Sequence, residues 1–161
     1  MSLKEWLTRF QAQHQRARAG TLDADGWASY RAGREELARA LMAAQKASLK
    51  PGETARQGLR VARAIQADLE WSVDRVRVVT LDISAGGFGA LLARAPPASE
   101  DVRVEFRLSG GEMLRAKARV VGVQVGATSS RVSFSFSEIG AAEREKVELV
   151  VFDTVLSQLS L

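Results

Sequence analysis

Hydrophobic positions in the first 20 residues recur with the spacing of a helix. Trp6, Leu7 and Phe10 lie within about one turn of one another, so an α-helix would place them on one face. Gly20 follows at a position where a helix C-cap is common. The pattern therefore predicts a helix that ends at Gly20.

A second and longer helix is predicted to follow, and to end before the turn signal at Pro51-Gly52. Asp23 and Asp25 are both suited to be its N-cap, since an aspartate side chain can accept a hydrogen bond from the first free backbone amides. Two amphipathic helices joined by a short loop form a hairpin over residues 1–50. This hairpin must bury its apolar stripe either on the rest of the chain or on a second copy. The stripe of the second helix consists of Trp27, Tyr30, Leu37, Leu41 and Ala44.

From residue 60 onward the period changes to two, which is the period of β-strands. The clearest example is the segment 102–108, in which Val102 and Val104 alternate with Arg103 and Glu105. The strands predicted in this way cover the segments 61–71, 75–81, 86–92, 102–108, 114–120 and 132–136.

The connections of these strands favour an antiparallel fold. Ser109-Gly-Gly111 is typical of a hairpin turn, and six short antiparallel strands imply a small barrel or sandwich. A last helix, over about residues 141–159, is expected to plug or flank it. We therefore predict a mainly β domain over residues 51–161 that follows the helical hairpin of residues 1–50.

Composition excludes several classes of function. The 161 residues are 46% hydrophobic and 26% charged, which suits one globular domain with an appendage. The absence of cysteine excludes disulfides, thiolate metal sites and thiol catalysis. The one histidine, His14, makes a histidine metal centre or proton relay hard to build and is interpreted as a surface or packing residue. No G-x-S-x-G motif or phosphate-binding glycine loop ending in Gly-Lys-Ser/Thr occurs. We expect no enzyme, no metal and no cofactor.

The start of the chain does not resemble a secretory signal, because Lys4, Glu5 and Arg9 interrupt its apolar residues. No apolar run approaches the ~20 residues that cross a bilayer. We therefore predict a soluble, cytoplasmic protein without membrane insertion.

The net charge of +4 is a small excess, and it is carried mainly by arginine, with 18 arginines against 5 lysines. The planar guanidinium suits phosphates and guanine edges, so an anionic partner fits the composition. Nucleic acid is one alternative, through a basic stripe on the predicted strands. Because Glu105 interrupts it, this stripe is typical of a solvated outer face, and we expect no DNA or RNA partner. It consists of Arg103, Arg107, Arg115, Lys117 and Arg119.

Two clusters remain as candidates for a binding site. Arg56-Gln-Gly-Leu-Arg60 lies at the entry to the first strand, where two arginines four residues apart can converge on one ligand. Asp82-Ile-Ser-Ala-Gly-Gly87 lies on the turn between the second and third strands. Aspartate and serine bond local amides in such turns, and glycine supplies a positive φ or a close backbone approach. Taken alone, each cluster is commonly structural.

Together and in this order, the clusters resemble the two signatures of the PilZ domain, a bacterial receptor module for cyclic di-GMP. The signature R-x-x-x-R stands here as Arg56 and Arg60, and (D/N)-x-S-x-x-G stands as Asp82, Ser84 and Gly87. The resemblance covers about residues 53–155. It implies a six-stranded antiparallel barrel with a C-terminal helix, and a ligand with two phosphates and two guanines.

The resemblance also implies a role for each signature residue. Arg56 and Arg60 are expected to contact phosphates and bases, Asp82 and Ser84 the guanine edge, and Gly87 to allow close backbone approach. Leu59 and Gly86 are neighbours that line the site.

The chain departs from many ligand-binding members at Ala55, where those members have a further arginine. This affects whether one or two nucleotides bind, and Arg63 or Arg131 are candidates to compensate. Two functions remain open. The first is a cyclic di-GMP effector that changes its conformation and its contacts with a protein partner. The second is a scaffold of the same fold that binds no nucleotide, and acts through its helices as a homodimer or on a partner protein.

Overall fold

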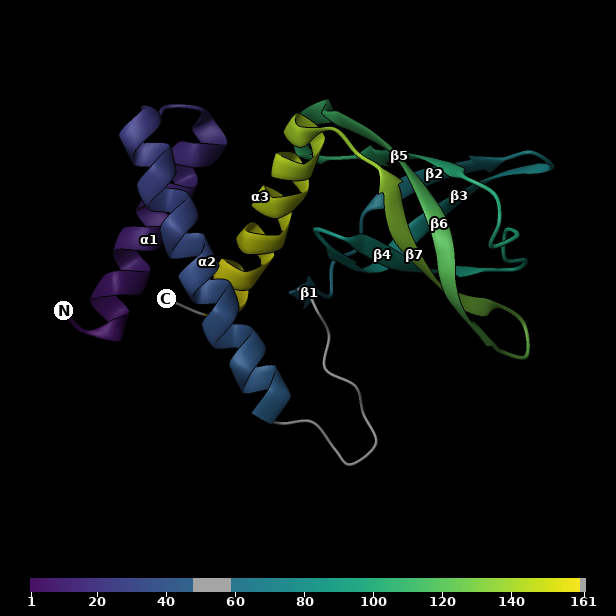
Figure 1. Ribbon diagram of the computed structural model, residues 1–161, viewed down its shortest axis with the longest axis horizontal. Coiled ribbons are helices and arrows are strands. Elements are labelled where there is room, and N and C mark those ends of the chain that lie inside the picture. The colour runs from purple at the N-terminus through teal and green to yellow at the C-terminus, as the bar shows by residue number, and fades with distance from the viewer. Residues whose placement is uncertain (48–58, 160–161) are drawn as a thin grey trace. The chain divides into compact units, whose positions relative to one another are not determined.

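The computed structural model describes residues 1–47 and 59–159 (Figure 1). These residues divide into two compact units, one formed by Met1–Leu59 with Leu149–Leu161 and the other by Arg60–Glu148. The elements run in the order α1 (Leu3–Ala19), α2 (Ala24–Ala47), β1 (Arg60–Val61), β2 (Gln66–Trp71), β3 (Asp74–Ser84), β4 (Gly87–Leu92), β5 (Val102–Arg107), a 3-10 turn (Ser109–Gly111), β6 (Met113–Val125), β7 (Ser130–Glu138) and α3 (Ala141–Gln158).

The first helix has well-formed caps at both ends. At its start, the Ser2 hydroxyl accepts from the Glu5 amide and the Glu5 carboxylate accepts from the Ser2 amide, at 3.2 and 2.7 Å. These hydrogen bonds lower the pKa of Glu5. At its end, Gly20 takes the left-handed conformation with a φ of 71°. The predicted end of this helix is confirmed.

The second helix begins directly after Asp23, whose Oδ1 accepts from the Gly26 amide at 2.7 Å. Asp23 is therefore the N-cap of α2, while Asp25 lies in its first turn. The helix is described as far as Ala47, and the predicted turn at Pro51-Gly52 lies outside the described residues. None of the helices in the described part of the chain is long and apolar enough to span a membrane.

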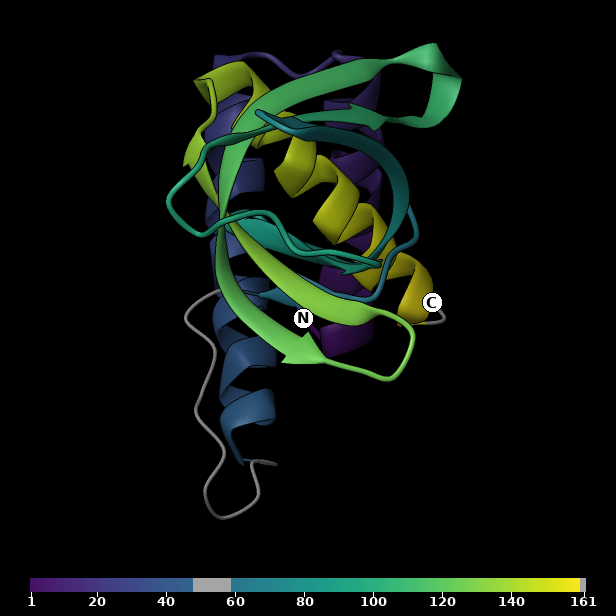
Figure 2. The same cartoon turned by 90° about the vertical axis from the view of Figure 1, so that its right-hand side faces the viewer.

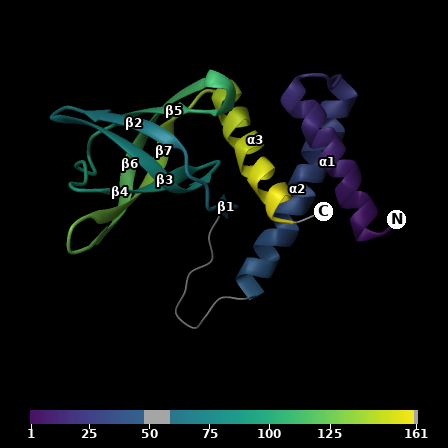
Figure 3. The same cartoon turned by 180° about the vertical axis from the view of Figure 1, so that it is seen from behind.

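Aromatic rings form the core of the helical unit, in which α1 and α2 lie side by side as a hairpin (Figure 3). Phe10 stacks on Trp6 and on Tyr30, each with ring centres 5.4 Å apart, and its edge meets Phe152 of α3. Phe10 and Tyr30 are fully buried. Three helices thus share one apolar core in this unit.

His14 is buried in this core, next to the aromatic rings. Its Nδ1 shares a hydrogen bond of 2.8 Å with the Tyr30 hydroxyl, and its Nε2 lies 3.4 Å from Asp153 Oδ1. Arg18 donates to the same carboxylate oxygen at 2.9 Å. Burial lowers the pKa of His14, while Asp153 opposes that shift. His14 is therefore a packing residue and not a surface residue, which were the two alternatives from the sequence.

The second unit contains a closed barrel of six antiparallel strands, as predicted (Figure 2). The strands follow the order β3-β2-β5-β6-β7-β4, and β4 pairs again with β3 to close the barrel. The two-residue strand β1 adds a further pairing to the end of β3, with Arg60 opposite Ser84.

The alternation of the strands separates a core from an outer face. Phe88, Phe106 and Phe134 are almost fully buried, and the rings of Phe88 and Phe134 stack with centres 4.7 Å apart. In β5, Val102 and Val104 are buried, as their alternation predicted. Residues of the opposite parity therefore form the outer face of the barrel.

The first predicted strand is wrong in one respect, because it is divided into β1 and β2. The chain leaves the sheet at residues 62–65, between β1 and β2, and Thr80 of β3 forms hydrogen bonds with this segment. The Thr80 hydroxyl accepts from the Ile65 amide at 2.9 Å and donates to the Arg63 carbonyl at 2.6 Å. The predicted turn at 109–111 joins β5 and β6 as a short 3-10 turn, with positive φ at Gly110 and Gly111.

Candidate functional site

The turn between β3 and β4 carries the Asp-Ser-Gly cluster. Ser84, the last residue of β3, pairs with Gly87, the first residue of β4. The Ser84 hydroxyl accepts from the Gly86 amide at 3.3 Å and donates to the Gly87 carbonyl at 3.4 Å. The expected local bonding of the serine is therefore present.

Gly87 is required by the close approach of another strand. A Cβ at this position would overlap the carbonyl oxygen of Phe134 in β7. Among the described residues, positive φ angles of glycine occur at Gly20, Gly110 and Gly111. Glycine at position 87 is therefore needed for the close approach of β7 and not for a positive φ. The approach that the structure shows is to the protein's own backbone.

Asp82 is the buried charge of this corner, and only 5% of its surface is exposed. Its Oδ2 accepts from Arg131 Nη2 at 3.0 Å, while its Oδ1 lies 3.6 Å from Arg60 Nη1. Within the described residues, Oδ1 has no hydrogen-bond partner. A buried carboxylate is stable only beside opposite charge, and two arginines from different strands provide it.

Arg60 reaches this corner because β1 pairs with the end of β3, which places it opposite Ser84. Leu59 precedes it and is half-buried, as is Gly86 on the turn. Arg60 is thus brought to the cluster of Asp82, Ser84, Gly86 and Gly87, which follows it by more than 20 residues in the sequence. Arg56, the other member of the first signature, lies outside the described residues.

Two further residues at this corner lie outside both signatures. Arg131 of β7, a candidate to compensate for Ala55, forms the ion pair with Asp82. Gly89 was not anticipated, and a Cβ there would lie 2.9 Å from Asp82 Oδ1. The period of two offered a signal for it, because Gly89 shares a strand face with Gly87.

A row of small residues crosses the outer face beside Asp82. One row across the strands pairs Asp82 with Gly89, Gly89 with Ser133 and Ser133 with Gly122, and the next row pairs Gly87 with Ser135. Beyond Asp82, the first row has no large side chain on β4 and β7, whereas the second continues from Ser135 to Arg119. The barrel surface over Gly89 and Ser133, next to the carboxylate, can therefore accept a flat ligand.

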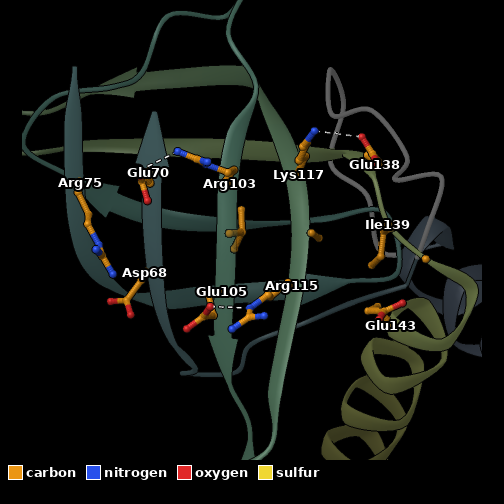
Figure 4. A pocket seen from close by; sticks show the side chains of 13 residues that line it. Asp68, Glu70, Arg75, Arg103, Glu105, Arg115, Lys117, Glu138, Ile139 and Glu143 are labelled. Atoms are coloured by element: carbon orange, nitrogen blue, oxygen red, sulfur yellow. Dashed lines mark hydrogen bonds and ion pairs between the residues drawn. The ribbon is translucent and has the colours of Figure 1, made fainter. Parts of the chain in front are cut away.

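A separate pocket of about 500 Å³ lies over β2, β5 and β6 at the start of α3 (Figure 4). Many of the side chains that line it are charged, and several of these pair with one another. Arg103 binds Glu70 at 2.7 Å, and Arg115 binds Glu105 at 2.8 Å. None of the residues that line it belongs to the two signatures.

The basic stripe considered for nucleic acid is neutralised by its neighbours. Each of its five basic side chains lies within ion-pair distance of an acidic one, for example Arg119 at 2.8 Å from Asp101. The hydrogen bond from Arg119 holds the pKa of Asp101 below its usual range. The outer face is therefore balanced in charge along this stripe.

Comparison with known proteins bears on the whole barrel. A family model described as PilZ domain matches residues 54–153, and no curated protein matches the chain. Among solved structures, the inhibitor of motility MotI/DgrA of Bacillus subtilis gives a TM-score of 0.58 at 20% identity, over 68% of this chain and 57% of that one.

Two structures that contain c-di-GMP (cyclic di-GMP) also match. The PilZ domain of YcgR from Escherichia coli gives a TM-score of 0.52 at 18% identity, over 65% of this chain and 95% of that one. MrkH of K. pneumonia gives 0.57 at 13% identity, over 66% of this chain and 54% of that one. The chain thus spans little more than half the length of two of these three proteins, and the three likenesses show the fold. None of these comparisons indicates a catalytic family.

Proposed function

The chain belongs to the PilZ domain family, and we propose that it binds cyclic di-GMP and relays this signal to a protein partner in the cytoplasm. The observation that carries the proposal is the convergence of Arg60, Asp82 and Ser84 at one corner of the barrel. The complexes of YcgR and MrkH with c-di-GMP support the same ligand class.

The chemistry of the corner suits guanine. The guanine edge presents the N1–H and N2–H donors, and a carboxylate such as that of Asp82 accepts both, whereas adenine offers no such pair. Arginine can grip guanine O6 and N7 or phosphate oxygens with two parallel bonds, and can stack on a base. By analogy with DNA recognition, one good bidentate contact discriminates between bases by about 1–3 kcal/mol.

The relay follows from where the first signature lies in the chain. Arg56 belongs to the segment that joins α2 to β1, four residues before Arg60. A ligand held by Arg56, Arg60 and the Asp82 corner would bind that segment and the barrel together. Because a ligand shifts only equilibria in which it makes different contacts, this segment is where binding would change the presentation of residues 1–50 to a partner protein or a second copy.

Calorimetric titration of the full chain tests the proposal, with cyclic di-AMP as the matched ligand that lacks the guanine donors. We expect binding of cyclic di-GMP and none of cyclic di-AMP. Asp82→Ala should weaken binding about 100-fold, since each hydrogen bond to a charged acceptor contributes ~1.5–3 kcal/mol. Arg60→Ala should also weaken it, while Arg103→Ala, which removes an arginine of the outer-face ion pairs, should not. No heat and no thermal shift at high micromolar cyclic di-GMP would contradict the proposal.

A second candidate function is a scaffold that binds no nucleotide. The observation in its favour is that Asp82 is already paired with Arg60 and Arg131 in the absence of ligand, so these residues can stabilise the barrel by themselves. The scaffold predicts that Asp82→Ala lowers the melting temperature although the wild-type protein gives no binding heat. It also predicts that Trp6→Ala abolishes partner binding while Arg56→Ala leaves it intact.

A further inference from the structure

The two carboxylate oxygens of Asp82 have different surroundings. Oδ2 accepts a charge-assisted hydrogen bond from Arg131 Nη2 at 3.0 Å. Oδ1 has no hydrogen-bond partner among the described residues, and the nearest cation, Arg60 Nη1, is 3.6 Å away. One oxygen is therefore fixed by the protein, and the other retains its capacity to accept a hydrogen bond.

Arg131 reaches Asp82 across an intervening strand. Asp82 belongs to β3 and Arg131 to β7, and β4 pairs with both. At the crossing point β4 presents Gly89, which pairs with Asp82 and has no side chain to obstruct the contact. The Arg131 side chain is about half exposed, while that of Asp82 is almost fully buried. An arginine at the surface thus fixes a carboxylate beneath it.

Fixing one oxygen also determines where the other points. A carboxylate held at Oδ2 cannot rotate freely about its χ2 bond, so Oδ1 keeps a constant position beside Gly89. Ordering a carboxylate before binding reduces the entropy that the ligand would otherwise have to remove. Oδ2 keeps a second lone pair, so a guanine edge can bond both oxygens while Arg131 stays in place.

We propose that Arg131 is a positioning residue for ligand binding, which holds Asp82 through Oδ2 so that Oδ1 faces the guanine. The inference rests on the proposed function of the site. It assigns to Arg131 a role through Asp82 and not a contact with the ligand, and this distinction can be measured.

A double-mutant cycle of Arg131→Ala and Asp82→Asn, read by calorimetric titration with cyclic di-GMP, tests the proposal. Arg131→Ala should weaken binding roughly tenfold or more, the range for a lost hydrogen bond to a charged group. In the Asp82→Asn background the same change should have little further effect, because the group it positions is gone. Arg131→Lys, which retains the charge and one donor, should recover part of the affinity. Arg103→Ala is the matched control for removal of a paired surface arginine, and melting curves check that each variant is folded.

The outcomes separate the possible roles. Additive effects in the cycle would show that Arg131 contacts the ligand itself, and a gain in affinity for Arg131→Ala would show that it competes with the ligand. Either result overturns the inference. So does wild-type affinity in Arg131→Ala when Asp82→Asn binds weakly, and in that case the proposed function stands. If the wild-type protein binds no cyclic di-GMP, the proposed function and this inference fall together.

Discussion

Among the described residues, His14, Asp82 and Glu100 each have a buried polar atom without a hydrogen-bond partner. The first two lie in opposite kinds of surroundings. His14 of the helical unit lies between Tyr30 and Asp153 and is completely inaccessible. Asp82 of the barrel is buried too, but the two arginines beside it are exposed to about a quarter and a half, and small residues flank it. The Nε2 of His14 therefore faces side chains of a packed core, whereas Oδ1 of Asp82 lies beside partly exposed arginines and small residues, where a ligand can approach.

This comparison predicts that damage to the helical core changes stability and leaves the ligand site intact. Phe10→Ala removes a ring that contacts Trp6, Tyr30 and Phe152. Its loss should reduce the free energy of unfolding by about 3–5 kcal/mol. Denaturant unfolding measures this effect, and the affinity for cyclic di-GMP below the transition should stay at the wild-type value. If Phe10→Ala also weakened the binding of cyclic di-GMP, the helical core and the barrel corner would be coupled, and the contrast between them would not hold.

At the barrel corner, the comparison predicts an effect on binding that exceeds the effect on stability. Gly89→Ala would place a Cβ 2.9 Å from Asp82 Oδ1. Because the obstructing atom belongs to a side chain, Oδ1 can be displaced at a smaller cost in stability than the backbone overlap at Gly87 would have. Displacement of this acceptor should weaken binding by roughly tenfold, as for one impaired hydrogen bond to a charged group.

Two other glycines serve as controls for this variant. Gly122→Ala lies in the same row of the sheet, but its Cβ would have room, with Ser133 Cβ at 3.8 Å. It should bind like the wild type. Gly87→Ala would overlap a backbone carbonyl and should lower the melting temperature. If Gly122→Ala weakened binding as much as Gly89→Ala, the effect would come from bulk on the row and not from Asp82.

The periodicity of the sequence predicted the helices and strands of both regions. It did not show which of their buried polar residues, His14 or Asp82, belongs to a ligand site. Alternation is enough to place Val102 and Val104 inside the barrel, and helical spacing is enough to place Phe10 in a core. The signature motif identified Asp82, and β1 brings Arg60 to it. The two core placements follow from local rules for helices and strands, whereas the signature rests on the family resemblance and β1 pairs with a strand more than 20 residues away.

The remaining features depend on contacts that local patterns do not specify. Arg131 meets Asp82 because β4 lies between their two strands and offers a glycine at the crossing, which requires the order of strands in the barrel. The division of the first predicted strand depends on the side-chain bonds of Thr80, fifteen residues from Ile65. The burial of His14 depends on Tyr30 and Asp153, from two other helices.

The smallest predicted effect is a pH dependence of the stability of the helical unit. Burial lowers the pKa of His14 in the folded state, against about 6.5 in the unfolded chain. The folded state therefore binds the proton less readily. The contribution of His14 to the free energy of unfolding is therefore complete above about pH 6.5 and is lost as the pH falls through the lowered pKa. The loss is about 1.4 kcal/mol for each pH unit that separates the two pKa values. Thermal unfolding between pH 7.5 and 5 measures this slope, and His14→Gln should remove it while it keeps a polar partner for Tyr30. An unchanged slope in that variant would assign the pH dependence to other groups.

Asp153 and Arg18 also face this ring. Asp153→Asn should increase the loss of stability at low pH, because the carboxylate that favours the protonated imidazole is gone.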